Sequence, residues 1–423
     1  MKKLLLTALV ASTVVFTSCF KDDDTPIIIE ETTIIQNPGG GSDDECPVIA
    51  VTGEIADGTV WTNDNIYQLN QKVVVPAGAT LTINPGTIIK GSSGTGSLAS
   101  ALIIARGATI NANGTANEPI IFTSSADNIT CGETAGTNLD ENDRGLWGGL
   151  IVLGNAPCSF SGDIPEAQIE GIPADDTFGL YGGTVADDSS GSLRYISIRH
   201  GGALIGEGNE INGLTLGGVG SGTVIDNIEV VGNVDDGVEF FGGTCNASNL
   251  LVWAQGDDAL DIDQAYAGTI DNAVVVLGDI SDHAFEIDGP EGTANGAFTL
   301  RNVTIVGNNV TSNGEYADYR SNAQGLTENV YAYGFPAGKD VELDNDGVAT
   351  NYNNGDLTFG PWEIVLPTGV TNVTDIFVNN AETVTVSGFG STATAVTEGS
   401  QTVGANTSNL SWTYSNVVGG LGF

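Results

Sequence analysis

Positively charged residues are scarce in this sequence of 423 residues, which has 12 Lys and Arg against 53 Asp and Glu and a formal net charge of −41. No lysine occurs between Lys90 and Lys339. A field of this sign repels nucleic acid and anionic membrane surfaces, whereas metal cations and neutral sugars are not repelled. The composition therefore excludes a nucleic-acid partner and favours cations or glycans.

Helical signals are also absent, because no apolar stripe with a 3.6-residue period and capping residues follows Cys46. Short runs of Val, Ile, Leu and Thr are instead interrupted by Gly, Asn and Asp, which is typical of short strands. With 15% charged residues the chain is too weakly charged for a disordered protein and long enough to bury a large core.

The N-terminus has a basic start and an apolar run that ends at Phe16, which predict an export signal over residues 1–18 that is too short to span a membrane. The residues up to Cys19 resemble a bacterial lipobox, which implies cleavage before Cys19 and acylation of its thiol. The following "FKDDD" resembles the acidic tag of Bacteroidota surface lipoproteins, and a solvated linker explains it equally. We expect an outer-membrane lipoprotein that faces the cell exterior, with its lipid as the only membrane contact and a flexible tether over 19–45.

Four further cysteines remain, and they are Cys46, Cys131, Cys158 and Cys245. In an oxidising envelope they predict two disulfides with three alternative pairings. We favour Cys131 with Cys158, because both flank one expected loop excursion. No Cys-x-x-Cys spacing is present, so a zinc site is not expected.

An asparagine recurs ahead of a short strand in "IDNIEVVG", "SNLLVWAQG", "IDNAVVVLG", "LRNVTIVG" and "TENVYAYG", at spacings of 22, 23, 30 and 27. These asparagines are Asn227, Asn249, Asn272, Asn302 and Asn329. Such a period with strands and no helices predicts a coil in which each turn stacks on the last. Asn tolerates left-handed backbone, and its amide can hydrogen-bond the equivalent Asn of the adjacent coil.

A second strand of each coil aligns "GVEFF", "ALDID" and "AFEID". Strand alternation places two columns in the core, which are Val238, Leu260 and Phe285, and Phe240, Ile262 and Ile287. The same alternation turns Glu239, Asp261 and Glu286 toward water in a third column. A fourth column contains Phe241, Asp263 and Asp288.

These repeats resemble the right-handed parallel β-helix, or pectin lyase-like, superfamily over roughly residues 60 to 336. The opening coils, "VVVPAGATLTINPGTIIKG" and "LIIARGATINANGTANEPIIFTS", resemble those of bacterial surface β-helix proteins. The resemblance implies an all-β fold with a right-handed parallel β-helix over 46–337, followed by C-terminal coils and a cap over 338–423. We expect Trp412, Leu421 and Phe423 to plug the open end.

The acidic columns need compensation, because carboxylates one coil apart repel by roughly 1 kcal/mol even in bulk water. Bridging calcium, bound protons or splaying into solvent would each relieve the repulsion. We expect calcium as the cofactor. Its predicted ligands are Asp236, Glu239, Asp258, Asp261, Asp263, Glu286 and Asp288.

Catalysis is the alternative, because polygalacturonase-type glycosidases of the superfamily carry Asn-x-Asp, Asp-Asp, Gly-His-Gly and Arg-x-Lys motifs. Asp235 and the pair Asp257–Asp258 match the first two, whereas His283 lacks both glycines and Arg301 is not followed by the lysine. We therefore predict a non-catalytic module that binds an extracellular glycan or an envelope or matrix protein. The alternative is a glycoside hydrolase or polysaccharide lyase that uses Asp235, Asp257, Asp258 and His283.

Aromatic and histidine side chains add two expectations. Trp147, Trp253 and Trp362 would stack on sugar rings if exposed, and packing at an edge or in the core is the expected role of Trp253. His200 is expected to be a hydrogen-bonded turn residue.

Overall fold

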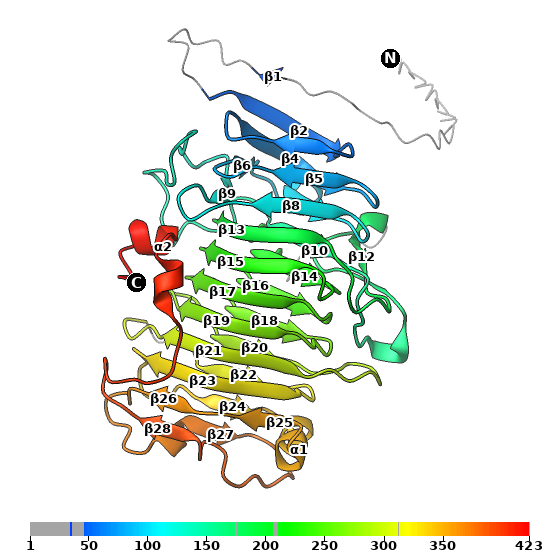
Figure 1. Cartoon of the computed structure of the whole chain (residues 1–423). Helices are drawn as coiled ribbons and strands as arrows, with labels where there is room; N and C mark the ends of the chain where they lie inside the picture. The colour runs from blue at the N-terminus through cyan, green and yellow to red at the C-terminus, as the bar shows by residue number, and fades with distance from the viewer. Residues whose placement is uncertain (1–33, 36–45, 174–175, 206–209, 312, 423) are drawn as a thin grey trace, which may run out of the picture. The chain divides into compact units, whose positions relative to one another are not determined.

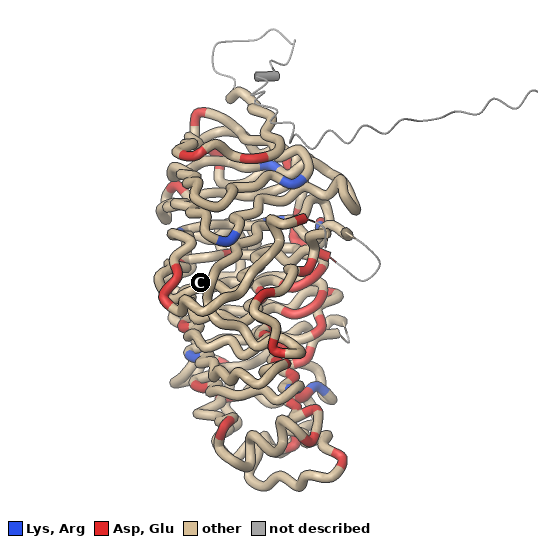
Figure 2. Tube along the Cα trace, turned by 90° about the vertical axis from the view of Figure 1, so that its right-hand side faces the viewer, with Lys and Arg blue, Asp and Glu red and all other residues tan. Residues whose placement is uncertain are grey.

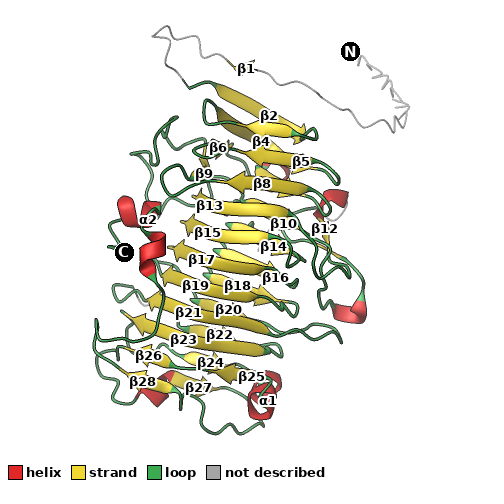
Figure 3. Ribbon diagram, viewed as in Figure 1, coloured by secondary structure: helices red, strands yellow, loops and turns green. Residues whose placement is uncertain are grey.

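The fold is built from parallel strands that stack in successive coils (Figure 1, Figure 3). The computed structural model describes residues 34–35, 46–173, 176–205, 210–311 and 313–422. Within them, 26 strands join in one sheet, in which every pairing is parallel except that of β1 (Ile34–Ile35) with β2 (Val48–Glu54). The predicted all-β parallel β-helix is thereby confirmed. Cys19, the predicted signal and most of the tether lie outside the described residues.

The coils share three walls of stacked strands. The first coils contain β3 (Thr59–Trp61), β4 (Ile66–Val75), β5 (Thr80–Ile83), β6 (Ile88–Gly91), β8 (Thr109–Asn113) and β9 (Ile120–Ser124). A series of long strands then forms two walls with a bend between them: β13 (Gly191–Arg199), β15 (Val224–Val231), β17 (Asn246–Trp253), β19 (Thr269–Val276), β21 (Phe298–Val306) and β23 (Gly325–Tyr333). Short strands form the third wall: β7 (Ala101–Ile104), β10 (Leu150–Leu153), β14 (Leu214–Gly217), β16 (Val238–Phe241), β18 (Leu260–Asp263), β20 (Phe285–Ile287), β22 (Ala317–Tyr319), β24 (Val341–Leu343) and β27 (Phe377–Asn379).

The bend falls on the repeated asparagine in the long strands from β15 to β23, and on Tyr195 in β13. All five predicted asparagines have left-handed backbone, with φ between 56° and 67°. Asn272 donates its amide hydrogen to Asn249 at 2.7 Å, and Asn329 donates to Asn302 at 3.1 Å. Asn249 and Asn302 donate instead to aspartates of the preceding coil, Asp226 and Asp271. The left-handed turns are therefore confirmed, and the predicted amide ladder is interrupted by carboxylates.

The core lies inside the coil, as the alternation predicts. Register pairs Val238 with Leu260 and Leu260 with Phe285, and all three side chains are at most 1% exposed. The long excursion between β10 and β13 covers part of the outside of the short-strand wall. It carries β11 (Ala167–Gln168) and β12 (Leu180–Tyr181), which pair antiparallel.

The disulfide prediction was wrong in its pairing, because Cys131 bonds to Cys46 with a Cα–Cα distance of 5.7 Å. Both cysteines pack against an apolar cluster on the outside of the first coils. The loop after β9 folds back onto this cluster and brings Cys131 to Cys46. Cys158 and Cys245 are free thiols. They cannot pair with each other because Cys245 belongs to the core inside the coil, whereas Cys158 packs with the cluster outside it.

The last coils end in an aromatic cluster rather than in the predicted plug. Phe389 lies 5.4 Å from Tyr352, 5.2 Å from Phe359 and 5.3 Å from Phe377, measured between ring centroids. These rings accompany β25 (Leu357–Phe359), β26 (Trp362–Ile364), β28 (Ala393–Ala395) and the helix α1 (Asp346–Asn354). Asn345 caps α1 at its N-terminus and Gly355 ends it in left-handed backbone, so the helix had capping signals that we did not identify in the sequence.

The C-terminal segment returns along the side of the coil instead of closing its end (Figure 1). It ends in the short helix α2 (Tyr414–Val417), and Tyr414 and Leu421 pack against outward-facing side chains of β15, β17 and β19. Trp412 contacts Tyr195 at 5.4 Å between ring centroids. The predicted plug of Trp412 and Leu421 is therefore wrong, and Phe423 lies outside the described residues. We call residues 404–421 the C-terminal clasp.

Candidate functional site

The turns that precede the short strands stack through their own side chains. Asp236 Oδ1 accepts the backbone N–H of Asp258 at 2.9 Å, and Asp258 Oδ1 accepts that of His283 at 2.7 Å. Asn212 Oδ1 accepts the N–H of Asp236 at 3.3 Å in the same way. The structure therefore brings Asp236, Asp258 and His283 together, and each carboxylate satisfies a backbone donor of the next coil.

A column of acids runs along the outside of the short-strand wall. Register pairs its members in the order Glu239, Asp261, Glu286, Asp318 and Glu342. We call these five residues the acidic ridge, and Figure 2 shows Asp and Glu gathered along one edge of the coil. Asp318 and Glu342 were not among the predicted residues, although "ADY" at 317–319 and "VEL" at 341–343 place an acid between two buried side chains as in the earlier coils.

Glu239 and Asp261 do not face water as predicted, since they are 4% and 8% exposed. The Asn212 amide donates a hydrogen bond to Glu239 Oε2. The excursion between β10 and β13 covers the adjacent position, where Tyr181 contacts Phe241 at 6.0 Å between ring centroids. Strand alternation predicts which side chains leave the core, but it does not predict which loop covers them.

Burial and mutual repulsion raise the pKa values along the ridge. Desolvation and then the charge of Asp236 raise the pKa of Glu239 well above its usual range. Desolvation and then Glu239 do the same to the pKa of Asp261. Desolvation is also the main cause that raises the pKa of Glu286 to about 9 and that of Asp318 to about 7. The ridge therefore needs bound protons or a counter-ion.

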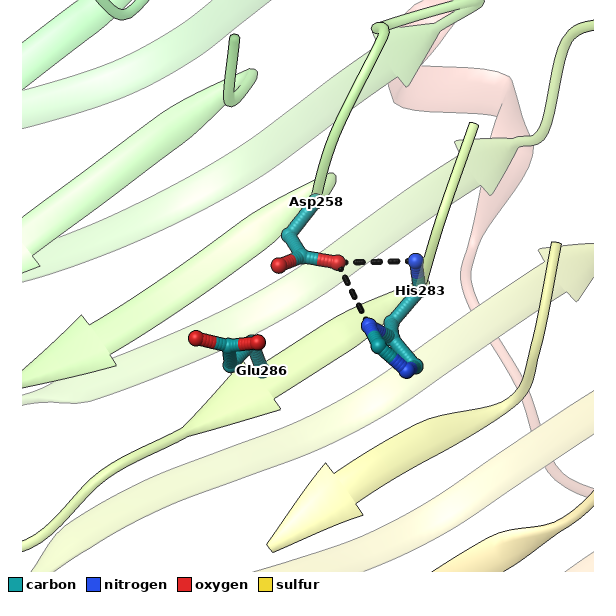
Figure 4. Close-up of side chains that lie close together, drawn as sticks. All are labelled: Asp258, His283 and Glu286. Atoms are coloured by element: carbon teal, nitrogen blue, oxygen red, sulfur yellow. Dashed lines mark hydrogen bonds and ion pairs between the residues drawn. The ribbon is translucent and has the colours of Figure 1, made fainter. Parts of the chain in front are cut away.

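Two cationic side chains interrupt the ridge near its centre. His283 Nδ1 lies 2.9 Å from Asp258 Oδ1, and Glu286 lies beside this pair (Figure 4). Arg320 forms an ion pair with Glu286 and a second one with Asp288 at 3.2 Å. Although burial opposes protonation, the hydrogen bond and charge of Asp258 raise the pKa of His283 to about 9. His283 and Arg320 therefore offset part of the negative charge at the centre of the ridge.

Carboxylates remain grouped on both sides of this centre. In each of four groups, one ligand atom per residue lies within 4.8 Å of the others. We call Asp236, Glu239 and Asp261 the buried carboxylate cluster, and Asp318, Glu342 and Asp344 the open carboxylate cluster. The other two groups are Asp235, Asp236 and Asp257, and the central group of Asp258, His283 and Glu286. Among the described residues, no Lys or Arg forms an ion pair with the buried carboxylate cluster. Of the predicted calcium ligands, Asp263 and Asp288 lie outside these groups.

Comparison with known proteins identifies the fold family. A model of the pectate-lyase-like β-helix domain matches residues 53–416, which is most of the chain. The chain belongs to the pectate-lyase-like β-helix family. No curated protein matches it.

Two solved structures resemble this pectate-lyase-like β-helix distantly. A pectin methylesterase from Aspergillus niger is 13% identical, with 90% of this chain and 97% of that chain covered and a TM-score of 0.31. The catalytic unit of a GH87 α-1,3-glucanase from Streptomyces thermodiastaticus is 11% identical, with 80% and 62% covered and a TM-score of 0.33. At these values neither likeness supports an argument about function.

The catalytic candidates lie together on this pectate-lyase-like β-helix, but their polygalacturonase-type motif is structural in part. The amide of Asn233, which precedes Asp235 in the matching motif, is buried and donates to two backbone carbonyl groups. Desolvation is the main cause that raises the pKa of Asp235 to about 7 and that of Asp257 to about 6. Asp258 and His283 form the pair described above, and Glu286 is the additional carboxyl group that the catalytic alternative had not included.

The aromatic candidates do not form a sugar-stacking surface. Trp147 and Trp362 are fully buried, and Trp253 is 9% exposed and packs beside Tyr414. His200 is buried with left-handed backbone, and its Nδ1 lies 2.7 Å from the Asp143 carbonyl oxygen, which confirms its turn role. No helix among the described residues has the length and apolarity to cross a membrane.

Proposed function

We propose that this protein is a non-catalytic binding module of the cell surface. Its acidic ridge holds divalent cations, of which calcium is the main candidate, and its ligand is an extracellular glycan or an envelope or matrix protein. The buried carboxylate cluster carries this proposal. Asp261 Oδ1 is buried and accepts no hydrogen bond. An unsatisfied buried polar group costs about 1–3 kcal/mol, and a charged one costs more. The cluster therefore needs a cation or a proton.

The chemistry of the buried carboxylate cluster fits calcium. Ca²⁺ takes six to eight oxygen ligands at about 2.3–2.6 Å, so two oxygens on the same ion lie at most about 5 Å apart. Oxygens of Asp236, Glu239 and Asp261 lie within 4.8 Å of one another. They come from two successive short strands and the turn before the first, so one ion would cross-link adjacent coils.

The proposed location rests on the N-terminal sequence. Acylation of Cys19 would attach the chain to the outer membrane, and the segment up to residue 45 would separate the β-helix from the lipid. Surface exposure would place the acidic ridge in a medium that supplies calcium. The net charge of −41 leaves cations, neutral glycans and cation-bridged acidic glycans as suitable partners.

Chelation is expected to lower the melting temperature of the purified mature chain. Removing the ion leaves the carboxylates of the buried carboxylate cluster uncompensated, and readdition of Ca²⁺ should restore the transition by mass action. Differential scanning calorimetry with EDTA and with CaCl₂ measures the shift. Asp261→Asn should reduce the response to Ca²⁺, whereas Glu118→Gln, at an exposed acid outside the ridge, should retain it. Identical midpoints in EDTA and CaCl₂ would remove calcium from the proposal.

A polysaccharide-degrading enzyme is the second candidate, and the group of Asp258, His283 and Glu286 favours it. The pKa of Glu286 is raised to about 9, so its carboxyl group could donate a proton, and the neighbouring Asp258 carboxylate, which pairs with His283, could accept one. We nevertheless expect assays for reducing ends and unsaturated products to stay silent on neutral and acidic polysaccharides, because Arg320 and His283 already occupy these carboxylates. Turnover that disappears in Asp258→Asn would establish the enzyme instead.

A further inference from the structure

A second group of carboxylates lies beyond the interrupted centre of the ridge. Asp318 and Glu342 are register partners on β22 and β24, and Asp344 follows two residues after Glu342. One oxygen from each of the three lies within 4.8 Å of the others. This is the open carboxylate cluster, and none of its members was among the ligands predicted from the sequence.

One member of the open carboxylate cluster has a buried oxygen without a partner. Asp318 is 7% exposed, and its Oδ1 is buried and accepts no hydrogen bond. The nearby cations are engaged elsewhere, since Arg320 pairs with Glu286 and Asp288, and Lys339 pairs with Glu315 at 3.1 Å. His283 and Arg320 act on the charge of Asp318 from nearby, but neither is ion-paired with it, since His283 pairs with Asp258. A buried carboxylate oxygen without a hydrogen-bond partner, on a side chain grouped with two further carboxylates, is an expected ligand of a metal ion.

The other two carboxylates are oriented by amide donors. Asn380 donates a hydrogen bond to Glu342 Oε2, and Asn345 donates one to Asp344 Oδ2 at 3.2 Å. These contacts engage one oxygen of each acid. Supported carboxylates of this kind form a preorganised ligand set.

The two clusters differ in their access to solvent. All three members of the buried carboxylate cluster are buried, whereas in the open carboxylate cluster Glu342 is half-buried and Asp344 is exposed. Coordinating through one oxygen each, these three carboxylates supply three of the six to eight oxygen ligands of calcium. An ion at the open carboxylate cluster would therefore keep coordination positions for oxygens from outside the protein.

We propose that Asp318, Glu342 and Asp344 form a second, solvent-accessible calcium site whose open positions bind the hydroxyl or carboxylate oxygens of a glycan. This inference rests on the proposed function and locates its ligand-binding point. The ion reconciles an acidic surface with a glycan ligand, because it supplies the positive charge that the protein lacks. In this proposal the ion at the buried carboxylate cluster stabilises the coils, and the ion at the open carboxylate cluster binds and releases the glycan.

The test uses the mature chain with the double substitution Glu342→Gln and Asp344→Asn, and each single substitution beside it. Isothermal titration with Ca²⁺ and Tb³⁺ luminescence should show two classes of site in the wild type and one in the double variant. The variant should keep the thermal stabilisation by Ca²⁺ that the buried carboxylate cluster provides. Glu382→Gln removes an exposed acid from the same region and should retain both classes.

Ligand binding is measured with immobilised polygalacturonate and with a neutral glucan, each with CaCl₂ and with EDTA. We expect Ca²⁺-dependent binding to at least one of these glycans. The affinity of the double variant for that glycan should be lower by about tenfold or more. The two probes distinguish carboxylate from hydroxyl ligands. A double variant with wild-type Ca²⁺ stoichiometry would disprove this site, and so would equal glycan binding by both proteins. A wild type that binds no Ca²⁺ at all would instead refute the proposed function.

Discussion

Glu229→Gln is expected to detach the C-terminal clasp and to destabilise the protein by about 3–5 kcal/mol, the usual cost of removing one partner from a buried charged network. Glu229 is fully buried on β15. Its carboxylate accepts the backbone N–H groups of Tyr414 and Ser415 at 3.0 and 2.8 Å. The hydroxyl groups of Ser415 and Ser197 also donate to it, both at 2.6 Å. A glutamine amide has only one acceptor oxygen for these four donors.

The surroundings of Glu229 increase the expected effect. The Arg199 guanidinium is buried, donates to Ser197 Oγ at 2.7 Å and lies 4.3 Å from the centroid of the Tyr414 ring. Loss of the Glu229 charge leaves this cation without its main counter-charge. Release of the clasp would also expose the apolar side chains of Leu251 and Val274 on the outside of the coil.

Urea denaturation measures the stability change, and limited proteolysis with mass spectrometry detects early cleavage within residues 404–421. Glu118→Gln makes the same chemical change at an exposed position and should leave both readouts unchanged. Removal of residues 404–423 should reproduce the Glu229→Gln phenotype. Wild-type stability and wild-type protection of the clasp in Glu229→Gln would contradict this account.

Stability in EDTA is expected to fall as the pH rises from about 5 to 9. Burial raises the pKa of Asp263 and that of Asp318 to about 7, and the pKa of Glu286 to about 9. The folded chain therefore binds more protons than the unfolded chain in this range, and stability decreases with pH wherever that is so. His283 acts in the same direction, because its pKa of about 9 stabilises the fold below 6.5 and this contribution is lost above 9. The sum is on the order of several kcal/mol, since each pKa unit corresponds to about 1.4 kcal/mol.

Calcium should flatten this pH profile, because the ion replaces the protons that compensate the ridge. Thermal melts at half-unit pH steps, in EDTA and in CaCl₂, give the two curves. Asp263→Asn removes one titrating group without removing a ligand of either carboxylate cluster, and it should reduce the slope in EDTA. A melting temperature that rises with pH in EDTA would show that the negative charge of the ridge carboxyl groups is compensated in some other way.

Features that repeat along the chain were predictable, because stacking places one coil directly over the next. The left-handed asparagines and the core position of Leu260 follow from local alternation and a period of 22 to 30 residues. The register of Glu239 and Asp261 follows for the same reason. Those parts of the fold require only that each coil resemble its neighbours.

Features that connect distant segments were not predictable in this way. Asn212 contacts Glu239, and an excursion outside the repeat covers the neighbouring Phe241, so the burial of this region has no periodic signal. Cys46 and Cys131 are separated by 85 residues, and the contact of Glu229 with Ser415 spans 186. Such contacts depend on how loops fold back onto the outer wall, and a period within the coils does not encode them.

The C-terminal clasp makes the order of synthesis important for assembly. The coils from β13 to β23 can stack as soon as they emerge, since each one contacts mainly its predecessor. Glu229 receives the hydrogen bonds of Tyr414 and Ser415 only after residues 404–421 have been synthesised. Until then a stripe of apolar side chains on three strands stays open to chaperones or to neighbouring molecules. A nascent chain that stalls before residue 404 would expose this apolar surface, and synthesis of the C-terminal clasp is the event that covers it.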